Sequence, residues 1–390
     1  MRLSYKYRIY PNQKQIEKLE EVFGFCRFLY NKALEERIDF YRKTGKSLSY
    51  NSQAAELPPI KEIYQDQTDS IYSQTLQSTL KQLDSAYKGF FRRVKAGSGK
   101  AGFPRFKNKD RFRSILFPQS NLNGFGIKQL ANSNVKIYGI PGEISVEFHR
   151  PIEGVCKNVR LVKQANNYYL VASCDNVPLN ILPKTDKTIA IDMGISNFIT
   201  TDDGTSFHHP RPYKTAKEKL AYFSRKLALK QRDSNNRYKV KKLLAKTYEH
   251  TVNIRNDFQH KLANELIKEN DTIIIEKLNV KGMLESKGFE VNKGNIQDAS
   301  WSSFAAKLSY KAERAGRKLI EVNPANTSKM CSKCGNIKEH MTLVDRTYHC
   351  EACGFDANRD HNAALNIKKL GMSYAAGISP ASEAPPFRTG

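Results

Sequence analysis

Four cysteines near the C-terminal end of the chain have the spacing of a metal site. Cys331 and Cys334 form one C-x2-C pair, Cys350 and Cys353 form a second, and fifteen residues separate the pairs. Four thiolates suit a tetrahedral Zn²⁺ at about 2.3 Å, and the glycine after each pair permits the tight turn of a zinc knuckle. A site closed by four thiolates has no open position for substrate. We therefore expect one structural zinc ion that folds a ribbon.

Three carboxylates occur at unusual places in apolar or helical segments. Asp192 interrupts an apolar run, Glu276 follows three isoleucines, and Asp360 precedes a helical pattern at 362–370. An ionised carboxylate in a buried strand costs several kcal/mol unless cations or hydrogen-bond donors compensate it. Each residue alone also fits a structural role: a turn-former before Gly194, a strand-end ion pair with Lys277, and a helix cap, respectively.

Together the three carboxylates fit a nuclease site that holds two Mg²⁺ ions. Such a site needs carboxylates from adjacent strands and a helix start, so that two ions about 4 Å apart activate water and stabilise a leaving 3′ oxygen. An aspartate in a first hairpin strand, a glutamate at a later strand end and an aspartate opening a C-terminal helix follow the order of ribonuclease H-like folds. We expect Asp192, Glu276 and Asp360 to be catalytic residues and magnesium ligands.

The segments around these carboxylates predict an α/β domain. After a linker at 183–187 we expect strands at 190–195, 197–201, 272–278 and 318–322, a basic helical hairpin at about 214–268, and helices at 301–316 and 362–370. The hairpin region 211–256 carries fourteen basic and three acidic residues. A basic helix face is often only solvated, but so few compensating acids favour contact with phosphates.

The N-terminal half predicts a helical segment joined to a small β-barrel or sheet. Residues 2–9 alternate apolar and polar, as in a strand, and a long amphipathic helix follows from Asn12 to Gly45. A second helical pattern covers 71–90, and 120–182 reads as short alternating strands that the first strand could complete. Between the two lies a loop, 92–113, that mixes cations with phenylalanines; it suits phosphate contact and base stacking, or is a solvated loop anchored by its phenylalanines.

Composition restricts the partners of this protein. The 390 residues carry a net charge of +25 with 39% hydrophobic and 10% aromatic residues, which indicates a folded protein with a polyanionic partner and excludes a disordered basic tail. The sequence has neither the roughly 18 consecutive apolar residues of a membrane span nor an apolar N-terminal segment. We expect a cytoplasmic, nucleoid-associated protein without a membrane partner.

Several motifs together resemble one known family. IDMGI, IIIEKL, CSKCG, CEACG and DANRDHNAALNI, preceded by LQSTLKQLDSAYKGFFRRVKAGSGKAGFPRFK, are similar to the TnpB family of transposon-encoded RNA-guided DNA endonucleases, which are related to the type V CRISPR effectors. The resemblance extends to about residue 372. It implies that Asp192, Glu276 and Asp360 are the triad of a RuvC-like nuclease domain.

The same resemblance implies a domain plan. Residues 1–10 and 116–182 would form a β-barrel wedge domain, with a helical recognition domain at 11–115 inserted in it. Residues 183–327 and 357–372 would form the RuvC-like domain, 328–356 its four-cysteine zinc-ribbon insertion, and 373–390 a disordered tail.

The resemblance also implies the partners. A guide RNA from the transposon end would direct the protein to double-stranded DNA beside a short target-adjacent motif, with one protomer on one RNA. Tyr50 and Gln77 are candidate motif readers, although Tyr50 also suits a core position and Gln77 a solvent-facing one. The candidate phosphate contacts are Arg92, Arg93, Arg105 and Lys107.

Other residues have simpler expected roles. We expect His208 and His209 to be a solvated pair, Trp301 to pack in a core, and Asp202 and Asp203 to form a turn. Two other functions also remain open. A guided DNA-binding repressor would not cut DNA, and a transposase or resolvase would join strands without any RNA.

Overall fold

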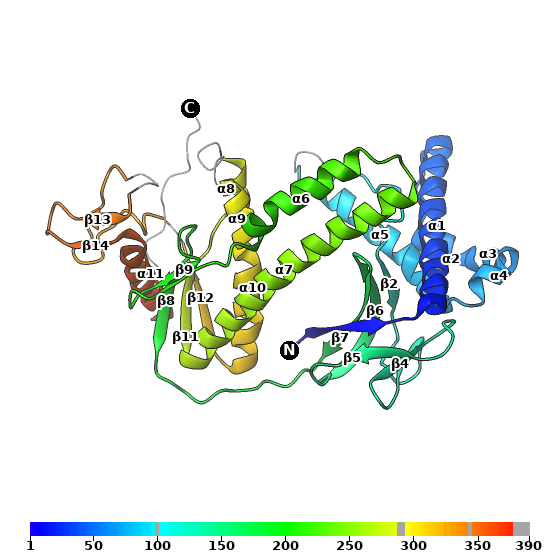
Figure 1. Ribbon diagram of the computed structural model, residues 1–390, viewed down its shortest axis with the longest axis horizontal. Coiled ribbons are helices and arrows are strands. Elements are labelled where there is room, and N and C mark those ends of the chain that lie inside the picture. Colours follow the sequence, from blue (N-terminus) through cyan, green and yellow to red (C-terminus); the bar gives the residue numbers. More distant parts are fainter. Residues whose placement is uncertain (98–100, 287–292, 324, 342–344, 377–390) are drawn as a thin grey trace. The chain divides into compact units, whose positions relative to one another are not determined.

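We describe a computed structural model of the chain, covering residues 1–97, 101–286, 293–323, 325–341 and 345–376. The chain divides into two compact units, Met1–Pro178 and Leu179–Gly390, each of which is described by itself (Figure 1). Among the described residues, no helix has the length and apolar character that crossing a membrane requires.

The first unit contains one antiparallel sheet of seven strands in the order β2-β6-β7-β1-β5-β4-β3. The strands are β1 (Leu3–Tyr10), β2 (Ser114–Phe117), β3 (Ile127–Gln129), β4 (Asn134–Ile137), β5 (Ile144–Glu147), β6 (Val155–Gln164) and β7 (Asn167–Asp175). The N-terminal strand β1 lies inside the sheet between β7 and β5, and buries alternate side chains. The pairing order has two ends, β2 and β3, so the sheet is an open form of the expected barrel.

Helices pack beside this sheet. They are α1 (Gln13–Thr44), α2 (Tyr50–Ala55), α3 (Leu57–Ile63), α4 (Gln65–Thr68) and α5 (Ser73–Lys95). Asn12 and Gln15 form a reciprocal capping box at the start of α1, and Gly45 ends the helix in the left-handed conformation at φ 68°. These ends agree with the helix predicted from Asn12 to Gly45.

The second unit is built on a five-stranded sheet in the order β10-β9-β8-β11-β12. Its strands are β8 (Thr188–Asp192), β9 (Ile199–Thr201), β10 (Ser206–Phe207), β11 (Thr272–Glu276) and β12 (Lys318–Val322). The first three form an antiparallel hairpin series, whereas β8, β11 and β12 run parallel. The four strands expected from the sequence correspond to β8, β9, β11 and β12, although β8 and β11 end earlier than expected, and β10 was not expected.

Helices cover both faces of this sheet. They are α6 (Pro212–Ala228), α7 (Asn235–Glu269), α8 (Val280–Glu285), α9 (Lys293–Ala299), α10 (Trp301–Ala315) and α11 (Arg359–Ala375). One face, with Ile191 and Ile275, packs against α7 and α10; the other, with Ala190 and Ile274, packs against α11. The helices α6 and α7 confirm the predicted basic hairpin (Figure 1).

The four-cysteine ribbon connects β12 to α11. It contains a short hairpin of β13 (Thr347–His349) and β14 (Asp356–Asn358). The helix α11 continues to Ala375, three residues into the segment predicted to be a disordered tail, and residues 377–390 lie outside the described residues. At Gly371 this helix approaches the sheet so closely that a Cβ atom would lie 2.3 Å from Cγ2 of Ile274.

Candidate active site and metal centre

The alternation of side chains along two parallel strands brings Asp192 and Glu276 to the same place. Ile191 and Ile275 are register partners, so the next residues, Asp192 and Glu276, end β8 and β11 at the same level. Because side chains alternate across a strand, both carboxylates share the face of Ala190 and Ile274, which is the face that α11 covers.

Asp360 enters from the first turn of α11 and completes the group. A Cβ atom on Gly194, just after β8, would lie 3.9 Å from Oδ2 of Asp360, so the loop after Asp192 is close to this carboxylate. Glu276 and Asp360 are buried, and Asp192 is half-buried. The structure therefore brings the three predicted catalytic residues together from two strand ends and one helix start.

The three carboxylates repel one another. Burial raises the pKa of Asp192 well above its usual range, and the charges of Glu276 and Asp360 raise it further, with only partial opposition from Arg359. Burial also raises the pKa of Glu276, opposed by a hydrogen bond from Thr327. A group of acids that disfavours its own ionisation in this way is suited to a cation that would neutralise it.

The helix-cap alternative for Asp360 is not observed. The helix cap of α11 is Asn358, whose Oδ1 accepts from the backbone N–H groups of Asp360 at 2.9 Å and His361 at 3.3 Å. Asp360 is thus free of the capping role, and its Oδ1 instead accepts from Nε and Nη2 of Arg359 at 3.1 and 3.0 Å. Glu276 accepts from Oγ1 of Thr327.

The four cysteines lie close enough together to bind one metal ion, because their sulfur atoms are all within 4.8 Å of one another. Among the described residues, this is the one group of three or more possible metal ligands with such spacing. The three carboxylates do not meet this spacing.

The cysteine cluster has the local geometry of two zinc knuckles. Gly335 and Gly354 have φ values of 80° and 66°, which let the chain turn tightly after each pair. The N–H of Gly335 donates to the carbonyl of Cys331 at 2.9 Å, and that of Gly354 to the carbonyl of Cys350 at 2.8 Å. The two turns are thus alike, as the repeated spacing predicted.

The thiols of this cluster affect each other's ionisation. Burial opposes ionisation of Cys331, but backbone N–H groups of Cys334 and Lys333 outweigh it and lower its pKa to about 7. Burial and the neighbouring cysteines raise the pKa of Cys353 to about 12. The backbone N–H of Phe355 opposes this increase but does not offset it. A divalent cation among the four sulfurs would remove this conflict by stabilising every thiolate, so the donor set fits zinc.

The predicted nucleic-acid contacts lie in the first unit, on α2, α5 and the loop after α5. Tyr50 is half-buried, packs against the core, and has Nζ of Lys81 at 5.4 Å from its ring centre, which supports the core interpretation. Gln77 is exposed on α5, in agreement with its solvent-facing alternative, and Arg92 is exposed at the end of that helix.

A groove of about 510 Å³ lies between α5 and the loop 101–111, with Arg93, Arg105 and Lys107 among its lining residues. Phe103 packs edge-on against Phe90, with ring centres 5.2 Å apart, so part of the loop is anchored as the alternative interpretation expected. Burial lowers the pKa of Lys107, whose Nζ lies 4.3 Å from the ring centre of Tyr30.

Other predictions have mixed outcomes. Trp301 is fully buried and Asp203 accepts two hydrogen bonds inside its turn, as expected. Asp202 does more than form the turn, because it accepts from the N–H of Ala190 at 2.7 Å and pairs with Lys368 of α11. The prediction of a solvated histidine pair is wrong for His209, which packs between Phe198 and Phe258.

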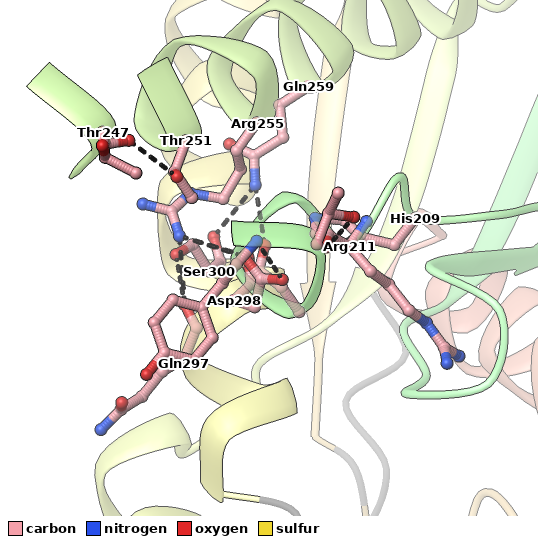
Figure 2. A network of polar contacts seen from close by, with 12 residues as sticks. His209, Arg211, Thr247, Thr251, Arg255, Gln259, Gln297, Asp298 and Ser300 are labelled. Atoms are coloured by element: carbon pink, nitrogen blue, oxygen red, sulfur yellow. Dashed lines mark hydrogen bonds and ion pairs between the residues drawn. The ribbon is translucent and has the colours of Figure 1, made fainter. Parts of the chain in front are cut away.

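A network of polar contacts joins α7 to residues 297–300 and to the start of α6 (Figure 2). Arg255 and Gln259 reach the backbone carbonyls of residues 297–300, and Asp298 accepts from the N–H of Tyr213 at 3.1 Å in the first turn of α6. Arg211, just before α6, donates to the carbonyls of Ile195 and Ser196 at 3.3 Å.

Sequence reasoning missed this network, and it also missed Thr327 and the paired Asn362 and Asn366. The two asparagines stand four residues apart within the motif DANRDHNAALNI, so their common helix face could have been predicted from the sequence. Thr327 and Arg211 carry no comparable local signal, because their partners are distant in the sequence.

In a comparison with known proteins, three family models match parts of this chain. One described as "Probable transposase" matches residues 173–287, one described as "Cas12f1-like, TNB domain" matches 301–367, and one described as "Helix-turn-helix domain" matches 1–46. The last description does not fit the structure, which has one strand and one uninterrupted helix over these residues.

Two relatives match nearly the whole chain. InsQ of Escherichia coli strain K12 is 29% identical, and the match covers 96% of this chain and 93% of InsQ. A protein of Streptomyces pristinaespiralis is also 29% identical, and that match covers 99% of this chain and 94% of the relative. Both carry the name "Putative RNA-guided DNA endonuclease".

A solved structure titled as a complex of Cas12f1 with single-guide RNA and target DNA shares the fold. The TM-score is 0.54 at 15% sequence identity, over 92% of this chain and 83% of that one. The models that match 173–287 and 301–367 and the relatives of nearly equal extent agree with the resemblance of this chain to the TnpB family.

Proposed function

We propose that this protein is an RNA-guided, Mg²⁺-dependent endonuclease that cuts double-stranded DNA next to a short target-adjacent motif. The observation that carries the proposal is the convergence of Asp192, Glu276 and Asp360 at two parallel strand ends and one helix start. The chain that presents this site is similar over nearly its whole length to proteins named as RNA-guided DNA endonucleases.

In the proposed mechanism, Asp192, Glu276 and Asp360 would hold two Mg²⁺ ions. When bound, these ions supply a water activated for attack and stabilisation of the leaving 3′ oxygen. The protein's own residues prepare the site: Arg359 holds one oxygen of Asp360, and Thr327 holds one oxygen of Glu276. Hydrolysis leaves 5′-phosphate and 3′-hydroxyl ends.

The positive charge is proposed to hold a guide RNA from the transposon end and the DNA target. The hairpin of α6 and α7 and the groove beside α5 present most of the cations that would contact phosphates. Arg92, Arg93, Arg105 and Lys107 are proposed phosphate contacts, and Tyr50 and Gln77 remain proposed motif readers. We propose a single structural Zn²⁺ on the four cysteines.

A transposase that joins strands is a second candidate, favoured by the description of the model that matches residues 173–287. It uses the same acidic residues but needs no RNA, and its products are joined strands instead of free ends. The two functions therefore differ in an outcome that gel analysis of the products detects.

The test is cleavage of a plasmid library that carries a randomised flank beside one target, by protein purified with RNA from its own element end. We expect cleavage next to one flank motif, lost in EDTA, after RNase treatment, and in Asp192→Ala. Binding of RNA and target without cleavage would favour a guided repressor. Joined products without RNA would favour the transposase.

A further inference from the structure

One short segment of the chain contacts Glu276 on one side and α11, the helix that carries Asp360, on the other. Residues 327–332 lie between β12 and the second cysteine pair, and they include Cys331. Thr327, at the start of this segment, is 2% exposed, and its hydroxyl donates to Oε1 of Glu276. One oxygen of Glu276 is thus held by a residue 51 positions away.

The other side of the segment is held by two asparagines of α11. Nδ2 of Asn366 donates to the carbonyl of Thr327 at 2.9 Å and to that of Met330 at 2.6 Å. Asn362 donates to Met330 at 2.8 Å and accepts from the N–H of Ser332 at 2.9 Å. Both asparagines are fully buried.

These contacts form a continuous connection between two proposed metal ligands. Asn362 and Asn366 belong to the helix that begins beside Asp360, and Thr327 reaches Glu276 on β11. Buried amides and hydroxyls that lose their partners leave unsatisfied polar groups, which costs about 1–3 kcal/mol each, so the connection is rigid in the folded state.

We propose that Thr327 is a positioning residue for Glu276, and that Asn362 and Asn366 set its place relative to Asp360. This rests on the proposed function, in which the acidic residues bind divalent metal. With one oxygen of Glu276 occupied by the Thr327 hydroxyl, the other is oriented for the ion. Outer contacts of this kind change metal affinity by about 10- to 100-fold in other metal sites.

The test is Mn²⁺ binding to the full chain, measured by calorimetry without RNA or DNA. Thr327→Val, which keeps the shape but removes the hydroxyl, is expected to weaken Mn²⁺ binding about tenfold, and Thr327→Ser to restore it. Thr251→Val is the matched control, since it removes a buried hydroxyl bonded only within α7 at 2.9 Å from the carbonyl of Thr247. Zinc content should remain unchanged in all three.

A double variant separates positioning from general damage to the fold. If Thr327 acts through Glu276, Thr327→Val combined with Glu276→Gln binds Mn²⁺ no more weakly than Glu276→Gln alone. Additive losses, wild-type affinity in Thr327→Val, or no recovery in Thr327→Ser would each overturn the proposal.

The proposed function can fail separately. Wild-type protein that binds Mn²⁺ but never cuts guided DNA would reject the nuclease and leave the positioning role intact. Wild-type protein that binds no Mn²⁺ would overturn the positioning role itself.

Discussion

The four-cysteine ribbon and the acidic site differ in how their ligands are assembled. The cysteines fall within 331–353, and each pair lies in its own knuckle, so local turns place the sulfurs. The three acids stand 84 positions apart from one to the next and come from β8, β11 and α11. Ribbon geometry is therefore mainly a local property, whereas acidic-site geometry depends on strand register and on the packing of α11 against the sheet.

The two sites also differ in charge balance. The mutual repulsion of the acids is only partly opposed by Arg359, which suits cations that bind for catalysis. The cysteines form a closed set of four, which suits an ion that stays bound and contributes to folding. The segment 327–332 connects the two sites, because it begins at Thr327, which contacts Glu276, and ends within the first cysteine pair.

The largest expected effect is on catalysis. Asp192→Ala should lower cleavage by about 10³-fold or more, with RNA and target binding retained, because it removes a proposed metal ligand and no proposed nucleic-acid contact. Cleavage and binding are measured on the same preparation, and Asp257→Ala, at an exposed ion pair with Lys261, serves as the control. Loss of binding together with cleavage would instead make Asp192 a structural residue.

The next largest effect concerns the structural role of zinc in the four-cysteine ribbon. Cys331→Ser should abolish zinc binding and lower the melting temperature by several degrees, because the binding energy of a structural zinc is folding energy. Zinc content by elemental analysis and thermal unfolding are the measurements. Cys156→Ser, a half-buried thiol in the first unit, should keep its zinc. Unchanged stability in Cys331→Ser would refute the structural role.

A pH dependence tests the packing of His209 in the second unit. Burial lowers the pKa of His209 to about 4, and the charges of Arg255 and Arg211 add to this effect. The folded protein therefore favours the neutral imidazole. The contribution of His209 to the free energy of unfolding is complete above about pH 6.5 and decreases as the pH falls towards 4, by at most about 3 kcal/mol. The unfolding temperature of His209→Gln should fall less over this range than that of wild type. Equal slopes would contradict the prediction.

The smallest effect concerns the packing of α11. A methyl group at position 371 would meet Ile274 at 2.3 Å, so Gly371→Ala should lower the stability of the second unit by about 1–3 kcal/mol. Thermal unfolding measures this change, and zinc content should stay normal because the knuckles do not depend on this contact. Gly294→Ala, where a Cβ would meet no atom within 4 Å, is the control. Zinc loss in Gly371→Ala would break the distinction between the two sites.

The candidate site could be predicted from the sequence only in part. The cysteine spacing predicted two knuckles that bring four sulfur atoms together. Asp192, Glu276 and Asp360 were selected as candidate site residues because they are carboxylates in apolar strands or at a helix start. Two interpretations differ from the structure, one because of a long-range contact and one because a neighbouring residue takes the expected role. His209, which was expected in solvent, packs against phenylalanines, and Asn358 takes the capping role considered for Asp360.

The sequence by itself determined the elements and the ligand types, because alternation, helical period, caps and C-x2-C spacing depend on residues that are near one another in the chain. Only the tertiary structure decided which side chains meet. The register of β8 and β11 places Asp192 and Glu276 on the sheet face that α11 covers. Hydrogen bonds of Thr327, Asn362 and Asn366 connect Glu276 to the helix that carries Asp360. These contacts depend on register and packing between segments far apart in the chain, and no local pattern encodes them.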